Sequence, residues 1–66
     1  MAVLKVIEIL SNSETSWEDA TKKAVKHASK SVKNIRSVYV KEQSASVKNG
    51  EVMDFRVNLK ITFEVD

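Results

Sequence analysis

Four acidic residues have side chains of the type that binds a hard cation. Calcium and magnesium take oxygen ligands, and carboxylates are common among them. The candidates are widely separated, and none lies in a run of Asp and Asn with the spacing of a calcium-binding loop: Glu14, Glu42, Asp54 and Glu64. We therefore expect calcium or another hard cation to bind only where symmetry brings several subunits together. The sequence leaves the metal ligands unassigned.

Two further residues could take part in ligand chemistry. Trp17 offers a ring on which a ligand could stack, and His27 offers a metal ligand or a proton acceptor. A tryptophan in the first turn of a helix more often packs against a sheet. A single histidine at the boundary of an apolar stripe more often has a structural or solvent-facing role. We favour these structural interpretations for both residues.

Five lysines share one side of a predicted helix and could bind phosphate or nucleic acid: Lys22, Lys23, Lys26, Lys30 and Lys33. Single-strand binders combine such charges with aromatic rings, and no aromatic residue is interleaved with these lysines. We therefore predict a solvent-exposed helix face and no nucleic-acid partner. The chain also lacks an ordered Ser, His and Asp set and recognisably spaced catalytic carboxylates, so we predict that it is not an enzyme.

The length of the chain, 66 residues, corresponds to one domain, residues 1–66. A chain this short buries only about 60% of its unfolded surface, so its own core is marginal. The chain has no cysteine and one histidine, which excludes disulfides, thiolate metal sites and a multi-histidine site within one chain. Association with further copies is the remaining common way to stabilise so small a domain.

Charge and hydropathy give little indication of other partners. The net charge of +2 is too balanced to indicate nucleic acid. No apolar run approaches the ~20 residues of a membrane span. The N-terminal residues "MAVLKVIEIL" lack the basic start and the small-residue cleavage site of a signal peptide. We expect a soluble, cytoplasmic protein with no membrane partner.

The elements that must position these residues begin with a strand and a helix. Residues 2–10 read as a strand with apolar side chains on both faces, which favours burial on both sides. Residues 16–34 have helical spacing, and Thr15 with Glu18 three residues later fits a capping box. The apolar stripe of this helix comprises Trp17, Ala20, Ala24, Ala28, Val32 and Ile35. Its alanines allow the helix to approach a sheet closely.

The second half of the chain predicts a long hairpin. A second strand begins at Val38, and Asn49-Gly50 indicates a type I′ turn. In "MDFRVNLKITFEV", residues 53–65, apolar and polar residues alternate strictly, as in a strand with two different faces. With Val52 this strand spans roughly 46 Å, whereas a compact chain of this length has a radius of gyration of about 11 Å.

These elements define an α+β fold of β-α-β-β order, a three-stranded antiparallel sheet wrapped around one helix. One helix covers only part of so long a hairpin. We therefore expect the hairpin to bend around its own helix and other copies of the chain to cover the excess.

The same order and length resemble the dodecin family, whose members assemble twelve subunits into a hollow shell. Three blocks carry the resemblance over about residues 5–66: "KVIEIL" at 5–10, "SWEDA" at 16–20 and "FRVNLKITFEV" at 55–65. The resemblance implies a homododecamer that binds or stores a small ligand or ion.

The resemblance also implies two ligand-binding positions, and this chain departs from the flavin-binding pattern at both. Ser37, in "SVYV", stands where those dodecins carry a tryptophan that stacks on the flavin. Arg56 stands where they carry a glutamine that hydrogen-bonds the flavin edge. The segments "TSWE" and "NIRSV" are closer to the calcium dodecin branch. Flavin is therefore a doubtful ligand, and a small anion at Arg56 or a cation is the expected one.

Two alternatives stay open for the function. The chain could form a structural shell without a specific ligand. It could instead bind flavin through other stacking residues, for which Tyr39 is the candidate.

Overall fold

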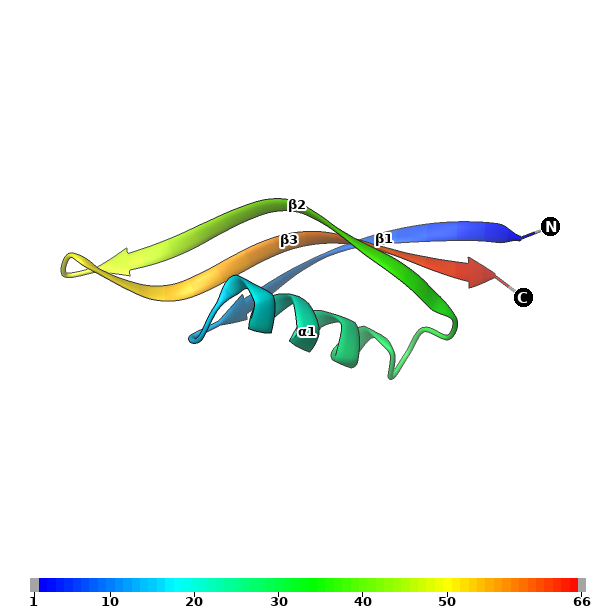
Figure 1. Cartoon of the computed structure of the whole chain (residues 1–66), viewed down its shortest axis with the longest axis horizontal. Helices are drawn as coiled ribbons and strands as arrows, with labels where there is room; N and C mark the ends of the chain where they lie inside the picture. The colour runs from blue at the N-terminus through cyan, green and yellow to red at the C-terminus, as the bar shows by residue number, and fades with distance from the viewer. Residues whose placement is uncertain (1, 66) are drawn as a thin grey trace.

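The computed structural model describes residues 2–65, while Met1 and Asp66, the ends of the predicted 1–66 domain, lie outside the described residues. The elements are β1 (Val3–Ser13), α1 (Trp17–Ala28), β2 (Ile35–Lys48) and β3 (Glu51–Val65). The three strands form one antiparallel sheet in the order β1-β3-β2, and α1 lies against one of its faces (Figure 1). The predicted β-α-β-β fold is confirmed.

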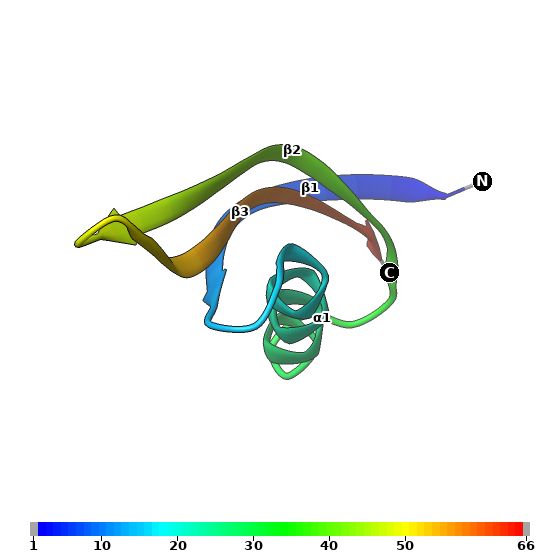
Figure 2. The ribbon, with the colours of Figure 1, turned by 60° about the vertical axis from the view of Figure 1, so that its left-hand side comes forward.

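The molecule is elongated because its hairpin extends well past the helix. Its principal extents are 51 × 19 × 13 Å, and its radius of gyration is 13.5 Å, compared with about 11 Å for a compact chain of this length. The sheet curves over α1, and the tip of the β2–β3 hairpin lies away from the helix (Figure 2). No part of the described chain, residues 2–65, covers this tip.

The core lies between α1 and the central strand. Ala20 and Ala24 on α1 pack against Val57 and Leu59 on β3, and all four are buried. Alanines at helical spacing allow the helix to come close to the sheet, and the alternation along β3 directs every second side chain toward it. The predicted helix stripe is therefore confirmed over Trp17–Ala28.

The opposite face of the sheet, which we call the outer face, is partly apolar and exposed. On β1 it presents Leu4, Val6 and Leu10, which are 54%, 56% and 68% exposed. The prediction that β1 is buried on both sides is therefore wrong for the single chain, because α1 covers only one face of the sheet. Val47 and Val52, which lie opposite each other near the hairpin tip, are also exposed on this face, whereas Met53 is exposed on the other face.

The helix begins one residue later than the predicted capping box implies. Ser16, with an extended backbone, is the N-cap, and its hydroxyl accepts a 3.0 Å hydrogen bond from the N–H of Asp19. The N–H of Thr15 donates instead to the Ser13 hydroxyl at 2.9 Å. The predicted N-cap, Thr15, is therefore wrong by one residue, and Ser16 takes that position.

The helix ends at Ala28, six residues before the predicted boundary at 34. The hydroxyl of Ser29 donates to the carbonyl of Lys26 at 2.8 Å, a local bond that competes with the continuing helix. Asn34 then adopts a φ of 61° and its carbonyl accepts from Glu64 N–H at 3.0 Å. Ile35, predicted on the helix stripe, is the first residue of β2.

The hairpin turn has the predicted backbone. Asn49 and Gly50 have φ values of 53° and 78°, and a type I′ turn requires positive φ at both central residues.

Among residues 2–65, no helix is long and apolar enough to cross a membrane.

Candidate functional site

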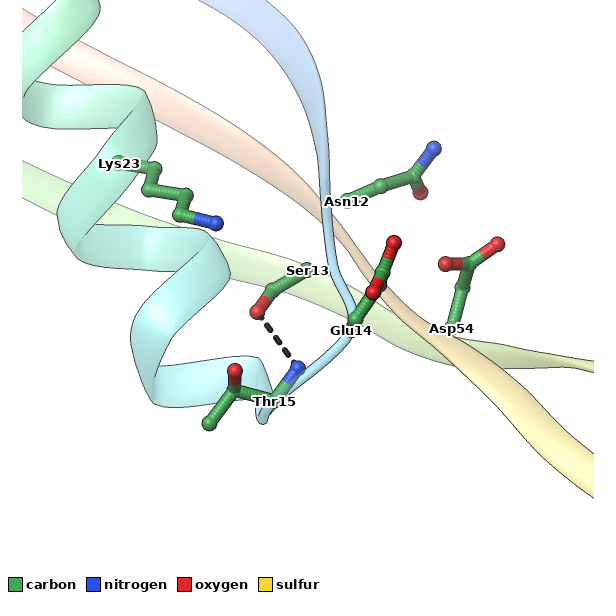
Figure 3. Close-up of a pocket in the computed structure, with 6 residues that line it drawn as sticks. All are labelled: Asn12, Ser13, Glu14, Thr15, Lys23 and Asp54. Carbon is green, nitrogen blue, oxygen red and sulfur yellow. Dashed lines mark hydrogen bonds between the residues drawn. The ribbon is translucent and has the colours of Figure 1, made fainter.

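A polar pocket lies where β1 ends, beside the start of α1 and the hairpin end of β3. Its volume is about 420 Å³, and it is lined by Asn12, Ser13, Glu14, Thr15, Lys23 and Asp54. Figure 3 shows the carboxylates of Glu14 and Asp54 and the amide of Asn12 on the side of β1 away from the helix. Ser13, Thr15 and Lys23 lie on the helix side. Side chains from the two ends of the sequence therefore meet at one corner of the sheet.

The register between β1 and β3 creates this corner. Asn12 lies opposite Arg56, and Ser13 lies opposite Phe55. Because side chains alternate along a strand, Asp54 and Arg56 share the outer face, while Phe55 points toward the helix. Glu14 follows the last residue of β1 and comes beside Asp54 (Figure 3).

Ser13 fixes the loop that carries Glu14. Its side chain is buried, with 3% exposure. Its hydroxyl donates to Asp19 Oδ2 at 2.6 Å and accepts from the N–H groups of Thr15 and Ser16 at 2.9 and 3.4 Å. The Ser13 hydrogen bond, followed by one from Lys23, lowers the pKa of the Asp19 carboxyl. The end of β1 is thus hydrogen-bonded to the start of α1.

We call Asn12, Glu14 and Asp54 the oxygen cluster, because these side chains offer two carboxylates and an amide oxygen. Such donors suit a hard cation, and calcium takes 6–8 oxygens in flexible geometry. No group of three or more His, Cys, Asp and Glu side chains among residues 2–65 is placed to hold a metal. Within one chain the oxygen cluster is therefore an incomplete ligand set, and a hard cation there would need further oxygens from water or another subunit.

The four carboxylates named from the sequence are only partly brought together. Glu14 and Asp54 share the pocket. Glu42 lies on β2 opposite Asn58, and Glu64 forms a 3.1 Å ion pair with Arg36. Sequence reasoning missed Asn12, because only the β1–β3 register shows that it lies beside residues more than forty positions away.

The two predicted ligand positions, Ser37 and Arg56, do not meet within one chain. Ser37 lies opposite Thr62, and Thr62 is six residues from Arg56 along β3, or about 20 Å in a strand. Both positions are exposed and on the outer face. A small ligand that contacts a Ser37 and an Arg56 at the same time must therefore lie between two subunits.

Arg56 has a defined partner beside the pocket. Its Nε–H donates to Asn12 Oδ1 at 2.8 Å across the β1–β3 pair. Asn12 is thereby shared between the oxygen cluster and a permanently charged guanidinium. Asp54 accepts a further hydrogen bond from the Ser46 hydroxyl at 3.2 Å.

A polar band crosses the outer face between its apolar residues. Lys41 pairs with Glu8 at 3.5 Å. A hydrogen bond from Asn58 and then the charge of Lys41 lower the pKa of the Glu8 carboxyl. Glu8 separates Leu4 and Val6 from Leu10 on β1. The outer face thus combines apolar contact area with a fixed polar pattern.

The structural interpretations of the two remaining candidates are consistent with the fold. Trp17 packs edge-on against Phe55 with ring centroids 4.9 Å apart. His27 is exposed and borders a second cavity of about 440 Å³ between β1 and α1. Two apolar residues, Ile9 and Leu10, form part of the lining of this cavity. The polar pocket has more side chains with oxygen atoms that could bind a cation.

The sequence of this chain is similar to those of known proteins. The sequence model of the Dodecin family matches residues 3–66. The calcium dodecin of Mycobacterium tuberculosis is 40% identical over 65 residues, which cover 98% of this chain and 92% of that protein. The similarity therefore extends over nearly the whole of both chains.

Solved structures agree with this assignment. The crystal structure of that calcium dodecin, described as having a novel calcium-binding site, has a TM-score of 0.84 at 40% identity and covers 97% of this chain and 91% of its own. A Thermus thermophilus dodecin variant, R45A, has a TM-score of 0.94 at 26% identity over 100% and 98% of the two chains. The predicted similarity to the calcium branch is confirmed, and the chain belongs to the dodecin family.

Proposed function

We propose that this protein is a shell-forming dodecin of twelve subunits that binds a small ion, with calcium as the ion of first choice. Its role is binding or storage rather than catalysis, and its predicted location is the cytoplasm. The observation that carries the proposal is the convergence of Glu14 and Asp54 in one pocket. The chain that provides it is 40% identical to a calcium dodecin.

The oxygen cluster is the proposed place of contact with the ion. Glu14 and Asp54 would supply carboxylate oxygens and Asn12 an amide oxygen, with water or a second subunit completing the ligand set. A bound calcium ion would neutralise the two carboxylates and join the loop after β1 to β3. The bonds of Ser13 hold the loop in place before the ion arrives, which reduces the ordering that binding requires.

Assembly is supported by the apolar surface that one chain leaves exposed. Among residues 2–65, six apolar side chains are buried, and three of these are alanines. In contrast, Leu4, Val6 and Leu10 on β1 and Val52 and Met53 on the hairpin are exposed. Exposed apolar side chains in this number on so small a chain are typical of a surface that another subunit covers. Further copies of the chain are the proposed cover, as the family resemblance implies.

Two measurements test the proposal. Native mass spectrometry should give about twelve times the chain mass of 7.4 kDa. Isothermal titration should detect calcium binding that weakens at least about tenfold in Glu14→Gln and in Asp54→Asn, since each loses a charged ligand. Glu42→Gln removes the same charge outside the pocket and should keep the parent affinity.

Other outcomes identify the competing functions. Calcium binding that is equally weakened by Glu42→Gln would place the ion elsewhere in the assembly. A twelve-subunit protein without calcium or any co-purified ligand would favour the structural shell. A stable monomer at micromolar concentration would contradict the assembly.

A further inference from the structure

We propose that Arg56 is an internal counter-charge of the oxygen cluster, so that Arg56 and a cation compete for Asn12. This inference rests on the proposed cation-binding function and deepens it. It assigns Arg56 a regulatory effect on the pocket: its positive charge weakens cation binding, and an anion that pairs with Arg56 restores it.

The contact between Arg56 and Asn12 is the structural basis. Arg56 Nε donates to Asn12 Oδ1 at 2.8 Å. Asn12 also lines the pocket with Glu14, Asp54 and Lys23, and the Lys23 ammonium is paired with the Asp19 carboxylate at 3.2 Å. Only the oxygen of the Asn12 amide can ligate a metal, because its nitrogen is a donor. The atom that a cation needs is therefore the atom that Arg56 already occupies.

The geometry leaves a bound cation two arrangements. If Arg56 keeps its hydrogen bond, a cation on Asn12 Oδ1 lies within about 5.5 Å of Arg56 Nε, given metal–oxygen distances of 2.3–2.6 Å. The two positive charges then repel each other. If Arg56 moves away, its hydrogen bond is lost. Both arrangements weaken cation binding relative to a pocket without this guanidinium.

The effect of Arg56 on the dissociation constant for calcium is large enough to measure even with solvent screening. A divalent and a monovalent charge about 5 Å apart in water repel enough to change a dissociation constant by about tenfold. Coupling between two sites is reciprocal. An anion that neutralises Arg56 therefore strengthens cation binding, and a bound cation frees Arg56 for an anion.

Arg36 provides a matched control for the charge of Arg56. Its Nε also pairs with an oxygen, Glu64 Oε1, at 3.1 Å. Glu64 is eight residues from Arg56 along β3, or about 26 Å in a strand. Arg36→Gln therefore removes the same charge beyond the range of screened interactions in physiological salt, about 8 Å.

The experiment is calcium titration of the assembled protein at fixed ionic strength. Arg56→Gln should bind calcium about tenfold more tightly than the parent, whereas Arg36→Gln and the charge-conserving Arg56→Lys should stay within about threefold of it. Replacing chloride by sulfate should tighten calcium binding in the parent and not in Arg56→Gln, when affinity is expressed against free calcium measured with an ion-selective electrode, because sulfate itself binds calcium. The Nε–Hε resonance of Arg56 should shift on calcium addition, because the ion either displaces its contact with Asn12 or lies within about 5.5 Å of it.

The outcomes separate this inference from the proposed function. If the parent binds calcium and Arg56→Gln changes its affinity no more than Arg36→Gln does, the inference is overturned and the proposed function stands. An equal effect of sulfate on the parent and Arg56→Gln also overturns it. If neither the parent nor Arg56→Gln binds calcium, both proposals fail. Binding by Arg56→Gln alone supports the inference in its strongest form.

Discussion

The indole N–H of Trp17 donates a 2.9 Å hydrogen bond to the backbone carbonyl of Ser44. Trp17 is the first residue of α1, and Ser44 lies on β2, 27 residues later. The same ring packs edge-on against Phe55 of β3. One side chain thus links the start of the helix to both strands of the hairpin, near the point where the hairpin leaves the helix.

Two substitutions of Trp17 should therefore lower the stability of the protein to different extents. Trp17→Phe keeps a ring but loses the donor to Ser44, and should lower the free energy of unfolding by about 0.5–1.5 kcal/mol per subunit. Trp17→Ala also loses the aromatic pair and should cost about 3–5 kcal/mol. Chemical denaturation followed by circular dichroism measures both effects.

The control for this series is Lys22→Ala on the exposed side of α1. Lys22 pairs only with Glu18 at 3.1 Å, and both side chains are largely exposed, so the change should stay within about 0.5 kcal/mol of the parent. Equal stability of Trp17→Phe and the parent would show that the bond to Ser44 contributes nothing in solution.

Local patterns predicted those parts of the fold that depend on neighbouring residues. The alternation over residues 53–65 correctly predicted which side chains of the central strand face the helix. The pair Asn49-Gly50 correctly predicted the turn. The cap was wrong by one residue, because Thr15 and Ser16 are both suitable N-cap residues and the sequence pattern does not choose between them. The end of the helix was wrong because it depends on a distant contact, the hydrogen bond from the N–H of Glu64 on β3 to the carbonyl of Asn34.

The candidate site was predictable only in its residue types. The sequence indicated carboxylates as possible ligands, but it gave no reason to join Glu14 with Asp54 and leave out Glu42. That choice follows from the register of β1 on β3. Asn12 was missed for the same reason: its neighbours Arg56 and Asp54 come from the other end of the chain.

The hairpin turn should be sensitive to the loss of its glycine. Gly50 has a φ of 78°, and no atom lies within 4 Å of a Cβ built there. Gly50→Val should therefore cost about 1–2 kcal/mol per subunit through backbone strain alone, without a steric clash. Gly50→Asn should cost less, because asparagine tolerates this conformation. Thermal melts that show both variants equal to the parent would contradict the type I′ turn.

The bond from Ser13 to Asp19 should make stability sensitive to acid. The pKa of Asp19 is lowered in the folded chain from its ordinary value of 3.8, so its stabilising effect is complete above that value. This effect disappears as the pH falls through the lowered pKa, where Asp19 becomes protonated. The same sign holds for Glu8, whose pKa is lowered from 4.5.

Unfolding measured between pH 2 and pH 7 should accordingly show stability falling below about pH 4. Asp19→Asn should reduce this dependence, while Glu18→Gln, at an exposed position of the same helical turn, should leave it in place. Ser13→Ala should lower stability at neutral pH, because the Asp19 carboxylate and the N–H groups of Thr15 and Ser16 lose their contact with the Ser13 hydroxyl. An unchanged acid profile in Asp19→Asn would assign the transition to other carboxyls.

The outer face should be required for assembly. Leu4→Lys or Val6→Lys places a charge on apolar surface that further copies are proposed to cover, and burying an unpaired charge is unfavourable. Light scattering should show smaller species than the parent for these variants. Lys22→Glu on the helix face is the control and should assemble like the parent. Full assembly of Leu4→Lys and Val6→Lys would show that β1 faces solvent in the oligomer.

Flavin binding should be weak in the parent and recoverable by two substitutions. Ser37 offers no ring in place of the tryptophan of flavin-binding dodecins, which should cost about 1–3 kcal/mol of stacking. Arg56 only donates hydrogen bonds, and its mismatch with the flavin edge should cost about 1–3 kcal/mol more where that edge is buried. The combined loss is roughly 10- to 10⁴-fold in affinity.

Quenching of riboflavin and FMN fluorescence tests this expectation. We expect little quenching by the parent and clear quenching by Ser37→Trp/Arg56→Gln. Tyr39 is the internal control: it is 64% exposed, shares the outer face with Ser37 and is the remaining aromatic side chain on that part of β2. Tight binding by the parent that disappears in Tyr39→Ala would show that Tyr39 supplies the stacking surface, and the non-flavin interpretation would then be wrong.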